Sequence, residues 1–236
     1  MSFFAITSDK PRHIKFIKTL QNLVDLSCVV VVPKDNSDKQ FTEEELRFFT
    51  GCNSLSYIEH VKCDKDNLES DYIINLLTQT RPEVGFIFGA PLISKRIYDI
   101  PKLGCVNIHT GLVQYYRGVD SSSWALYDNR LDRIGTTLHY IDDSIDAGRY
   151  IGQKTIDIRL DDTPNSIFFK TCQAGFDLIS ENISDIIENI CDSKHLTKRG
   201  TLYQVKDMKP EIKKEIYNSY KLKIKEFLDE NYSRSM

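Results

Sequence analysis

The chain has 236 residues, of which 41% are hydrophobic and 28% are charged, which is enough to bury one sizeable core. It contains no apolar run of about eighteen residues, and residues 1–6 carry no basic segment before a long apolar one, so we expect no membrane partner, no signal peptide and a cytoplasmic location. The formal net charge of −3 argues against a nucleic-acid partner, and six cysteines without a close pair argue against disulfides and a metal site.

Hydrophobic periodicity predicts strands that alternate with helices. Pro11 suits the first turn of a helix, and Thr42 with Glu45 forms a capping-box pattern that would begin another. In chain order, the predicted elements are a strand at residues 3–6, a helix at 11–23, a strand at 28–32, a short helix from 42, a helix at 71–80, a strand at 84–88, a short helix at 94–98, a strand at 104–109, a strand at 155–159, a long helix from 162, a short strand or hairpin at 200–203 and a closing helix at 211–231.

Most of these strands are apolar throughout, which predicts an α/β fold: a mostly parallel twisted sheet with helices on both faces. Sheets of this kind bind ligands at the carboxyl ends of their strands. We expect one core, residues 1–199, followed by a small C-terminal extension, residues 200–236. The long helix should turn a stripe of apolar residues to the core rather than to a cofactor, namely Ile167, Phe168, Cys172, Phe176, Ile179, Ile183 and Ile186.

Three polar residues suggest chemistry at a carbonyl carbon. The alternation of residues 104–109 sends Asn107 and His109 to the same face of a strand. The Asn107 amide and a protonated His109 could stabilise the oxyanion that forms when an amine attacks a carbonyl. Asp146 would raise the pKa of the imidazole and hold a water that moves the amine proton. Taken singly, the three also fit a turn cap, a half-buried histidine and a loop.

The spacing as a whole resembles the folate-dependent formyltransferases, the family of the methionyl-tRNA, glycinamide ribonucleotide and nucleotide-sugar enzymes. The resemblance is close over about residues 80 to 160. It implies a Rossmann-like formyltransferase core in residues 1–199, a catalytic set of Asn107, His109 and Asp146, and N10-formyltetrahydrofolate as formyl donor without a metal. The residues in register are Asn107, His109, Tyr116, Arg117, Gly118, Trp124, Ala125, Leu126, Gly135, Thr137, His139, Asp146 and Gly148.

Three departures from the family pattern affect the substrate loop. Gly111 stands where the family usually has Ser, Gln114 where it has Pro, and Ser121 where another Pro is frequent. None of these changes removes a member of the catalytic set.

A candidate folate site follows the strand at residues 84–88. Residues 89–93 would expose backbone donors and acceptors beside apolar side chains, which suits a flat heteroaromatic ring. A plain connecting turn, and a solvated turn for the paired acids, are the alternatives. The resemblance places the pterin at Pro91, Leu92, Ile93, Ile141, Asp142 and Asp143.

The acceptor amine is inferred mainly from what the sequence lacks. The loop after the first strand is not the glycine-rich phosphate loop of the purine enzymes. We also expect no additional basic C-terminal domain of the kind found in the tRNA enzymes, and no N-terminal regulatory domain like that of the formyl hydrolases. The remaining resemblance is to the nucleotide-sugar N-formyltransferases. It implies an aminodeoxysugar acceptor, in particular a dTDP-linked 4-amino-4,6-dideoxyhexose used for cell-surface polysaccharide such as O-antigen.

Several side chains could bind such a substrate. A helix N-terminus with cationic side chains suits a diphosphate, an arginine could bind phosphate or brace the loop, and a tyrosine could stack on the base. A solvated helix start and ordinary packing are the alternatives. The candidates are Lys10, Arg12, His13, Arg117, Tyr116 and Tyr203.

Other functions stay open. A formyltransferase acting on methionyl-tRNA or a small amine, a formyltetrahydrofolate hydrolase, and a non-catalytic folate-binding module fit parts of the pattern. The apolar residues after Gly200 exceed what an extension needs for solubility, so we expect some of them to be buried. Packing on the same chain is the conservative explanation, but the family resemblance implies a two-fold homodimer, which we expect.

Overall fold

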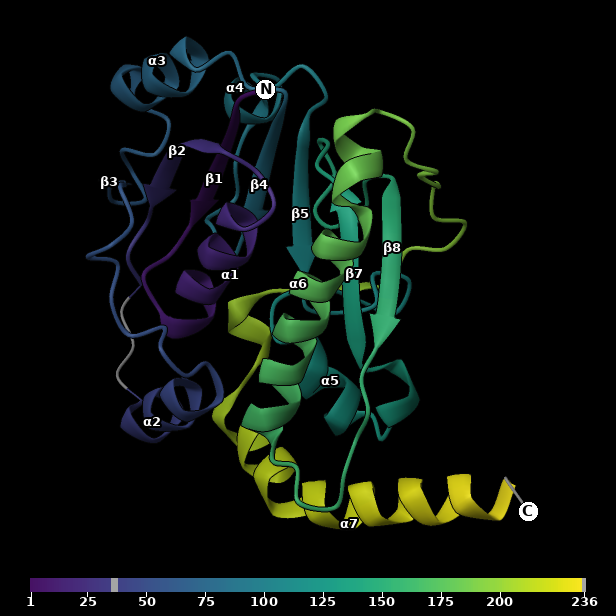
Figure 1. Ribbon diagram of the computed structural model, residues 1–236. Helices are drawn as coiled ribbons and strands as arrows, with labels where there is room; N and C mark the ends of the chain where they lie inside the picture. The colour runs from purple at the N-terminus through teal and green to yellow at the C-terminus, as the bar shows by residue number, and fades with distance from the viewer. Residues whose placement is uncertain (35–37, 235–236) are drawn as a thin grey trace.

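The computed structural model describes residues 1–34 and 38–234 as a twisted sheet with helices on both faces (Figure 1). The seven-stranded sheet has the order β3-β2-β1-β4-β5-β7-β8, and a separate pair is formed by β6 and β9. The neighbouring strands β3, β2, β1, β4 and β5 pair in parallel, whereas β7 pairs antiparallel with β5 on one side and with β8 on the other. The strands are β1 (Phe3–Thr7), β2 (Leu26–Val31), β3 (Val61–Lys62), β4 (Val84–Phe88), β5 (Cys105–His109), β6 (Tyr116–Gly118), β7 (Gly135–Tyr140), β8 (Tyr150–Thr155) and β9 (Thr201–Tyr203).

The helices divide between the two faces of the large sheet. Side chains of α1 and α6 share a core cluster with one face, and side chains of α3 and α4 share another with the opposite face. This arrangement confirms the predicted α/β fold. The α-helices are α1 (Pro11–Gln21), α2 (Lys39–Phe48), α3 (Asp71–Gln79), α4 (Lys95–Tyr98), α5 (Ser121–Tyr127), α6 (Pro164–Ile187) and α7 (Pro210–Arg234), and the 3₁₀ turns are Leu131–Arg133 and Val205–Asp207.

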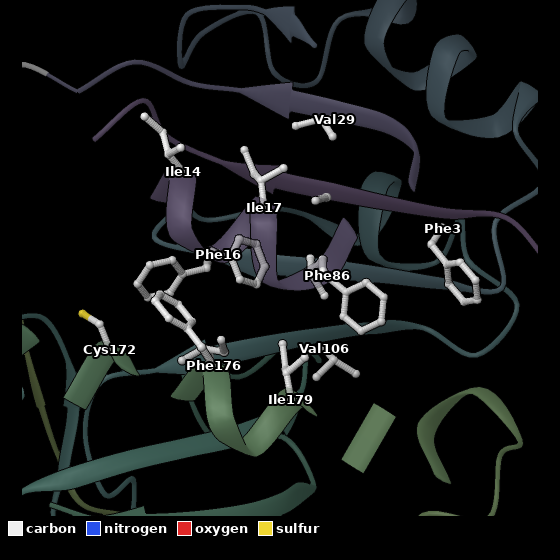
Figure 2. Packing of buried hydrophobic residues seen from close by; sticks show 14 of the residues in the cluster. Phe3, Ile14, Phe16, Ile17, Val29, Phe86, Val106, Cys172, Phe176 and Ile179 are labelled. Carbon is white, nitrogen blue, oxygen red and sulfur yellow. The ribbon is translucent and has the colours of Figure 1, made fainter. Parts of the chain in front are cut away.

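Aromatic side chains join α1 and α6 over the middle of the sheet (Figure 2). The rings of Phe88 on β4 and Phe176 on α6 lie 5.2 Å apart and nearly perpendicular, and Phe16 of α1 contacts both. Burial of each such ring stabilises the fold by roughly 1.5–3 kcal/mol. Because Phe88 is the last residue of β4, this packing also fixes the point at which the loop of residues 89–93 begins.

The C-terminal residues pack on the rest of the same chain. Ile216 and Ile224 of α7 are buried in a third cluster with Trp124 of α5, and β9 pairs with β6. The far end of α7 extends beyond the sheet (Figure 1). Division of the chain into residues 1–199 and 200–236 stays a proposal, as does the homodimer. Within residues 1–34 and 38–234, no helix combines the length and apolar character needed to cross a membrane.

Two predicted boundaries are wrong. The strand expected at residues 155–159 is β8, which ends at Thr155. The helix expected from Thr42 is α2, whose first residue is Lys39; the Asp38 side chain caps it by accepting a hydrogen bond from the Phe41 amide (3.0 Å). Glu45 does not cap α2: it is buried, and its carboxylate accepts hydrogen bonds from the backbone amide and the guanidinium of Arg12 in α1. Strands β3, β6 and β7 and helix α5 were not among the predicted elements.

Candidate active site

A cavity of about 800 Å³ opens beyond the ends of β4 and β5. Ligand pockets typically measure roughly 300–1,000 Å³, so this cavity is large enough for a drug-sized molecule. Its position matches the rule for parallel sheets. The candidate residues in its wall are Arg12, His13, Pro91, Leu92, Ile93, Asn107, His109, Ile141, Asp142, Asp146 and Tyr203.

The side chain of Asn107 is held by the neighbouring strand. Asn107 on β5 pairs in register with His139 on β7, and a hydrogen bond of 3.1 Å joins Asn107 Nδ2 to His139 Nε2. His139 Nδ1 donates to the Tyr140 carbonyl (2.9 Å), which leaves Nε2 to accept from Asn107. One amide N–H of Asn107 is thus used within the protein, and the second remains for a ligand.

His109 ends β5 and is only 6% exposed. Its Nδ1 lies 3.4 Å from Asp146 Oδ2, while its Nε2 lies 3.1 Å from both the Tyr116 carbonyl and Ser121 Oγ. Burial lowers the pKa of His109 below its usual value, although the Asp146 carboxylate acts in the opposite direction. Asp146 thus acts in the expected direction, but burial outweighs it, so the expected protonated form of His109 is wrong: near neutral pH the imidazole is neutral.

Asp146 lies between two imidazoles. Its carboxylate contacts His109 and lies 3.6 Å from His139 Nε2, and it accepts a hydrogen bond from the Gly118 amide (2.8 Å). Burial alone would raise the pKa of Asp146, but the facing His109 imidazole and the hydrogen bond from the Gly118 amide hold it well below its usual range. The backbone of Asp146 has φ +47°, a left-handed conformation that aspartate tolerates better than most residues. The site therefore holds an ionised carboxylate beside His109.

Arg117 braces the loop that carries Asp146. Its Nε and Nη2 both donate to the Ile145 carbonyl, at 2.9 and 2.5 Å. Among the described residues, Arg117 is not part of the cavity wall. The geometry supports the loop-bracing alternative rather than a phosphate contact.

Substitution of Arg117 by Ala is expected to lower kcat about tenfold and leave the KM for both substrates nearly unchanged, because the loss of both hydrogen bonds frees the Asp146 loop. Arg149→Ala is the matched control: Arg149 is an exposed cation close to the same loop and packs on the Tyr140 ring, 5.2 Å away. Steady-state kinetics of both variants provide the test. A raised KM for the acceptor with an unchanged kcat would instead assign Arg117 to substrate binding.

The wall formed by residues 89–93 offers unpaired backbone groups. In the described part of the chain, the backbone of residues 90–93 makes no hydrogen bond to a protein group. Ile93 is buried and Leu92 is 77% exposed, and Ile141 and Asp142 also line the cavity. Asp143 does not belong with these residues, because its carboxylate accepts a hydrogen bond from the Tyr98 hydroxyl outside the described cavity wall.

The predicted cationic cluster is only partly present. Arg12 lines the cavity, but its guanidinium binds the buried Glu45 at 2.5 Å. His13 is buried with Nδ1 on Thr7 Oγ1 (2.8 Å), and burial together with nearby cations lowers its pKa well below the usual value, so the positive charge expected from it is absent. Lys10 pairs with Asp9 at 3.3 Å and lies outside the described cavity wall.

Two other cations line the cavity that the sequence analysis did not select. Lys34 follows β2 and Lys65 follows β3, and both are part of the wall. Because parallel strands end at the same edge of a sheet, a lysine shortly after each strand was the available signal.

The two candidate tyrosines are committed to packing. Tyr116 is buried, and its hydroxyl donates to Asp128 (2.9 Å). Tyr203 lies against the Trp124 indole, with centroids 4.1 Å apart and an interplanar angle of 15°, although it also borders the cavity. Phe168, predicted to face the core, is half-buried and lines the cavity.

Comparison with known proteins agrees with this geometry. The sequence profile described as formyl transferase matches residues 13–183. The methionyl-tRNA formyltransferase of Thermodesulfovibrio yellowstonii is 31% identical over 137 residues, which cover 57% of this chain and 44% of that protein. The chain spans about half the length, or less, of the curated relatives it matches.

Solved structures share the fold. A sugar N-formyltransferase from Shewanella sp. has a TM-score of 0.65 at 18% identity, with coverage of 88% of this chain and 78% of that one. An N-formyltransferase from Helicobacter canadensis, in complex with folinic acid and dTDP-3-aminofucose, has a TM-score of 0.59 at 23% identity, with coverage of 89% and 73%. Because the profile covers more than half of the residues, the chain belongs to the formyl transferase family.

Proposed function

We propose that this protein transfers the formyl group of N10-formyltetrahydrofolate to the exocyclic amine of a nucleotide-linked aminodeoxysugar. The observation that carries the proposal is that one cavity is lined by three groups of residues. These are Asn107, His109 and Asp146; the loop of residues 90–93, here called the folate wall; and Arg12, Lys34 and Lys65, here called the cationic side. The finer assignment, a dTDP-linked 4-amino-4,6-dideoxyhexose destined for cell-surface polysaccharide, is part of the proposal.

The three central residues can divide the chemistry. Bound formylfolate supplies an activated formyl carbon. The acceptor amine forms a bond to the formyl carbon, the bond between that carbon and N10 breaks, and one proton moves from the amine to N10. Asn107 Nδ2 and His109 Nδ1 can donate to the oxygen on which negative charge develops. Asp146, ionised and next to His109, can take the amine proton and pass it on.

The folate wall fits a pterin on grounds of hydrogen bonding. Backbone N–H and C=O groups of residues 90–93 are unpaired within the described protein, and a pterin edge presents the complementary donors and acceptors. Pro91, Leu92 and Ile93 surround them with apolar surface, and Asp142 supplies a carboxylate. The Helicobacter canadensis structure, with folinic acid bound to a protein of the same fold, supports this donor.

The cationic side suits a diphosphate. Lys34 and Lys65 line it together with Arg12, whose charge is partly neutralised by Glu45. The dTDP-sugar in the Helicobacter canadensis structure and the UDP-sugar in the structure of PseJ from Anoxybacillus kamchatkensis support a nucleotide-sugar acceptor.

A second candidate is formylation of methionyl-tRNA, because several curated relatives of the chain carry that name. The two functions differ in acceptor and share the donor chemistry. Hydrolysis of the donor is a third outcome that the same residues permit.

In the test, the protein is incubated with formyltetrahydrofolate in three separate arms. The first contains a panel of aminosugar nucleotides, the second charged initiator tRNA, and the third no acceptor. Mass spectrometry of the acceptor should show gain of one formyl group on an aminosugar nucleotide. Asp146→Asn serves as the inactive control in each arm. Product on tRNA and on none of the sugar nucleotides would overturn the assignment.

The pH dependence of kcat should follow from a neutral His109. The attacking amine must be deprotonated, so the rate rises with pH, and because burial already lowers the pKa of His109, its deprotonation removes no activity near neutrality. We therefore expect an acid limb followed by a plateau into the mildly alkaline range, measured where chemistry limits turnover. A fall in rate just above neutral pH would indicate that a protonated imidazole is required.

A further inference from the structure

Gly111 and Ser121 compete for one small space beside the imidazole of His109. A Cβ atom at position 111 would lie 2.5 Å from Ser121 Cβ, 2.6 Å from Ser121 Oγ and 2.6 Å from His109 Nε2. Ser121 itself is 4% exposed, and its Oγ lies 3.1 Å from His109 Nε2. The Ser121 side chain therefore occupies the volume that a residue larger than glycine at position 111 would need.

The backbone directs Ser121 into this space. Ser121 is the first residue of α5, and Asp120 before it has φ +58°, in the left-handed region. Such a conformation costs about 1–3 kcal/mol for a residue other than glycine, so the surrounding contacts must hold it. The family pattern has Ser at position 111 and Pro at position 121. This chain has Gly111 and Ser121 instead, so the hydroxyl comes from position 121 rather than from position 111.

The Ser121 hydroxyl can determine which ring nitrogen of His109 carries the proton. His109 Nδ1 faces the Asp146 carboxylate at 3.4 Å, and a carboxylate favours a proton on the nearer nitrogen. In the neutral ring, Nε2 is then an acceptor. The Tyr116 carbonyl, also 3.1 Å from Nε2, can only accept, so it competes with Asp146 for the ring proton. The Ser121 hydroxyl can donate to a bare Nε2 and thus favours the proton on Nδ1.

We propose that Ser121 is a positioning residue whose hydroxyl donates to His109 Nε2 and fixes the tautomer that directs the Nδ1 proton toward Asp146 and the cavity. The inference rests on the proposed function only for its kinetic consequence. If instead Nε2 carries the proton and donates to the Tyr116 carbonyl, Ser121 is a packing residue.

Heteronuclear NMR of isotope-labelled histidine in the free protein tests the proton placement directly. The wild-type protein should show a protonated Nδ1 and a bare Nε2 on His109, and Ser121→Ala should shift the ring toward the Nε2-protonated tautomer. Ser122→Ala, which removes a hydroxyl that is equally buried one residue further along α5, should leave the tautomer unchanged. A protonated Nε2 in the wild type, or no change in Ser121→Ala, would overturn the proposal.

Kinetics of the same variants give a second readout. Ser121→Ala should lower kcat about tenfold with KM for both substrates within about twofold, and Ser122→Ala should match the wild type. An equal loss of kcat in Ser122→Ala would show that the effect is general to the start of α5. Because the NMR result needs no substrate, failure of every acceptor would refute the proposed function and leave the tautomer assignment standing.

Exchange of the residues at positions 111 and 121 tests whether their side chains occupy the same space. Gly111→Ser alone should lower kcat more than tenfold, because its Cβ meets Ser121 and His109. Combination with Ser121→Gly, which returns one hydroxyl and removes the opposing Cβ, should recover at least tenfold relative to Gly111→Ser. Losses that simply add in the double variant would contradict the coupling.

Discussion

Replacement of His109 by Asn, or of Asp146 by Asn, is expected to lower kcat by a factor on the order of 10² or more while the sheet stays folded. In the proposed mechanism, His109 supplies a donor for the developing oxyanion, and Asp146 takes the amine proton. The two side chains lie 3.4 Å apart and are mostly buried, so water replaces either function poorly.

The measurement is single-turnover formyl transfer, with circular dichroism to verify folding. His195→Asn is the control, because His195 is exposed and lies outside the described cavity wall. Since the two residues act as one unit, the double variant should be little slower than either single variant. Near-wild-type turnover in Asp146→Asn would remove the carboxylate from the mechanism.

Gly118→Ala is expected to destabilise the fold by at least about 3 kcal/mol. Gly118 has φ +83°, and a Cβ atom there would lie 2.0 Å from the Tyr203 carbonyl oxygen, a backbone atom of β9 that cannot turn aside. The same change should reduce activity, because the Gly118 amide donates to Asp146.

Gly104→Ala separates the two causes. Gly104 has the same φ of +83°, yet no atom lies within 4 Å of the Cβ that would be added. It should therefore cost only the backbone preference, about 1–2 kcal/mol. Denaturant unfolding of both variants measures the difference, and equal losses would show that contact between β6 and β9 is unimportant for stability.

The interior of the fold was predictable because its strands are buried on both faces. Apolar runs such as Phe3–Thr7 and Val84–Phe88 admit few alternatives. Strand β8 sits at the sheet edge, and its residues are only half-buried, so its apolar pattern is weak and the prediction placed it several residues late. The short strand β6 depends on pairing with β9, which lies far along the chain.

Local signals misled where a tertiary contact decided the outcome. Thr42 and Glu45 have the spacing of a capping box, but Glu45 instead forms a buried ion pair with Arg12 of α1. The capping role passes to Asp38, four residues earlier. No local rule distinguishes a glutamate that caps a helix from one that pairs across the core.

In the candidate site, too, some residues were predictable from the local sequence and others depend on tertiary contacts. Alternation alone placed Asn107 and His109 on one face, and the family spacing added Asp146. His139 was matched in the pattern but not selected, although its pairing with Asn107 follows once β5 and β7 are adjacent. The contact of Ser121 with His109 depends on the turn at Asp120, which the sequence does not reveal.

Donor consumption measured together with acceptor formylation shows whether the formyl group passes to an aminosugar or to water. The protein is mixed with formyltetrahydrofolate with and without an aminosugar nucleotide, and tetrahydrofolate, formate and formylated sugar are quantified over time. We expect tetrahydrofolate to be released only when the aminosugar is present, with one formylated sugar for each donor consumed and no free formate. Release of formate at the same rate without any acceptor would contradict it and identify a hydrolase.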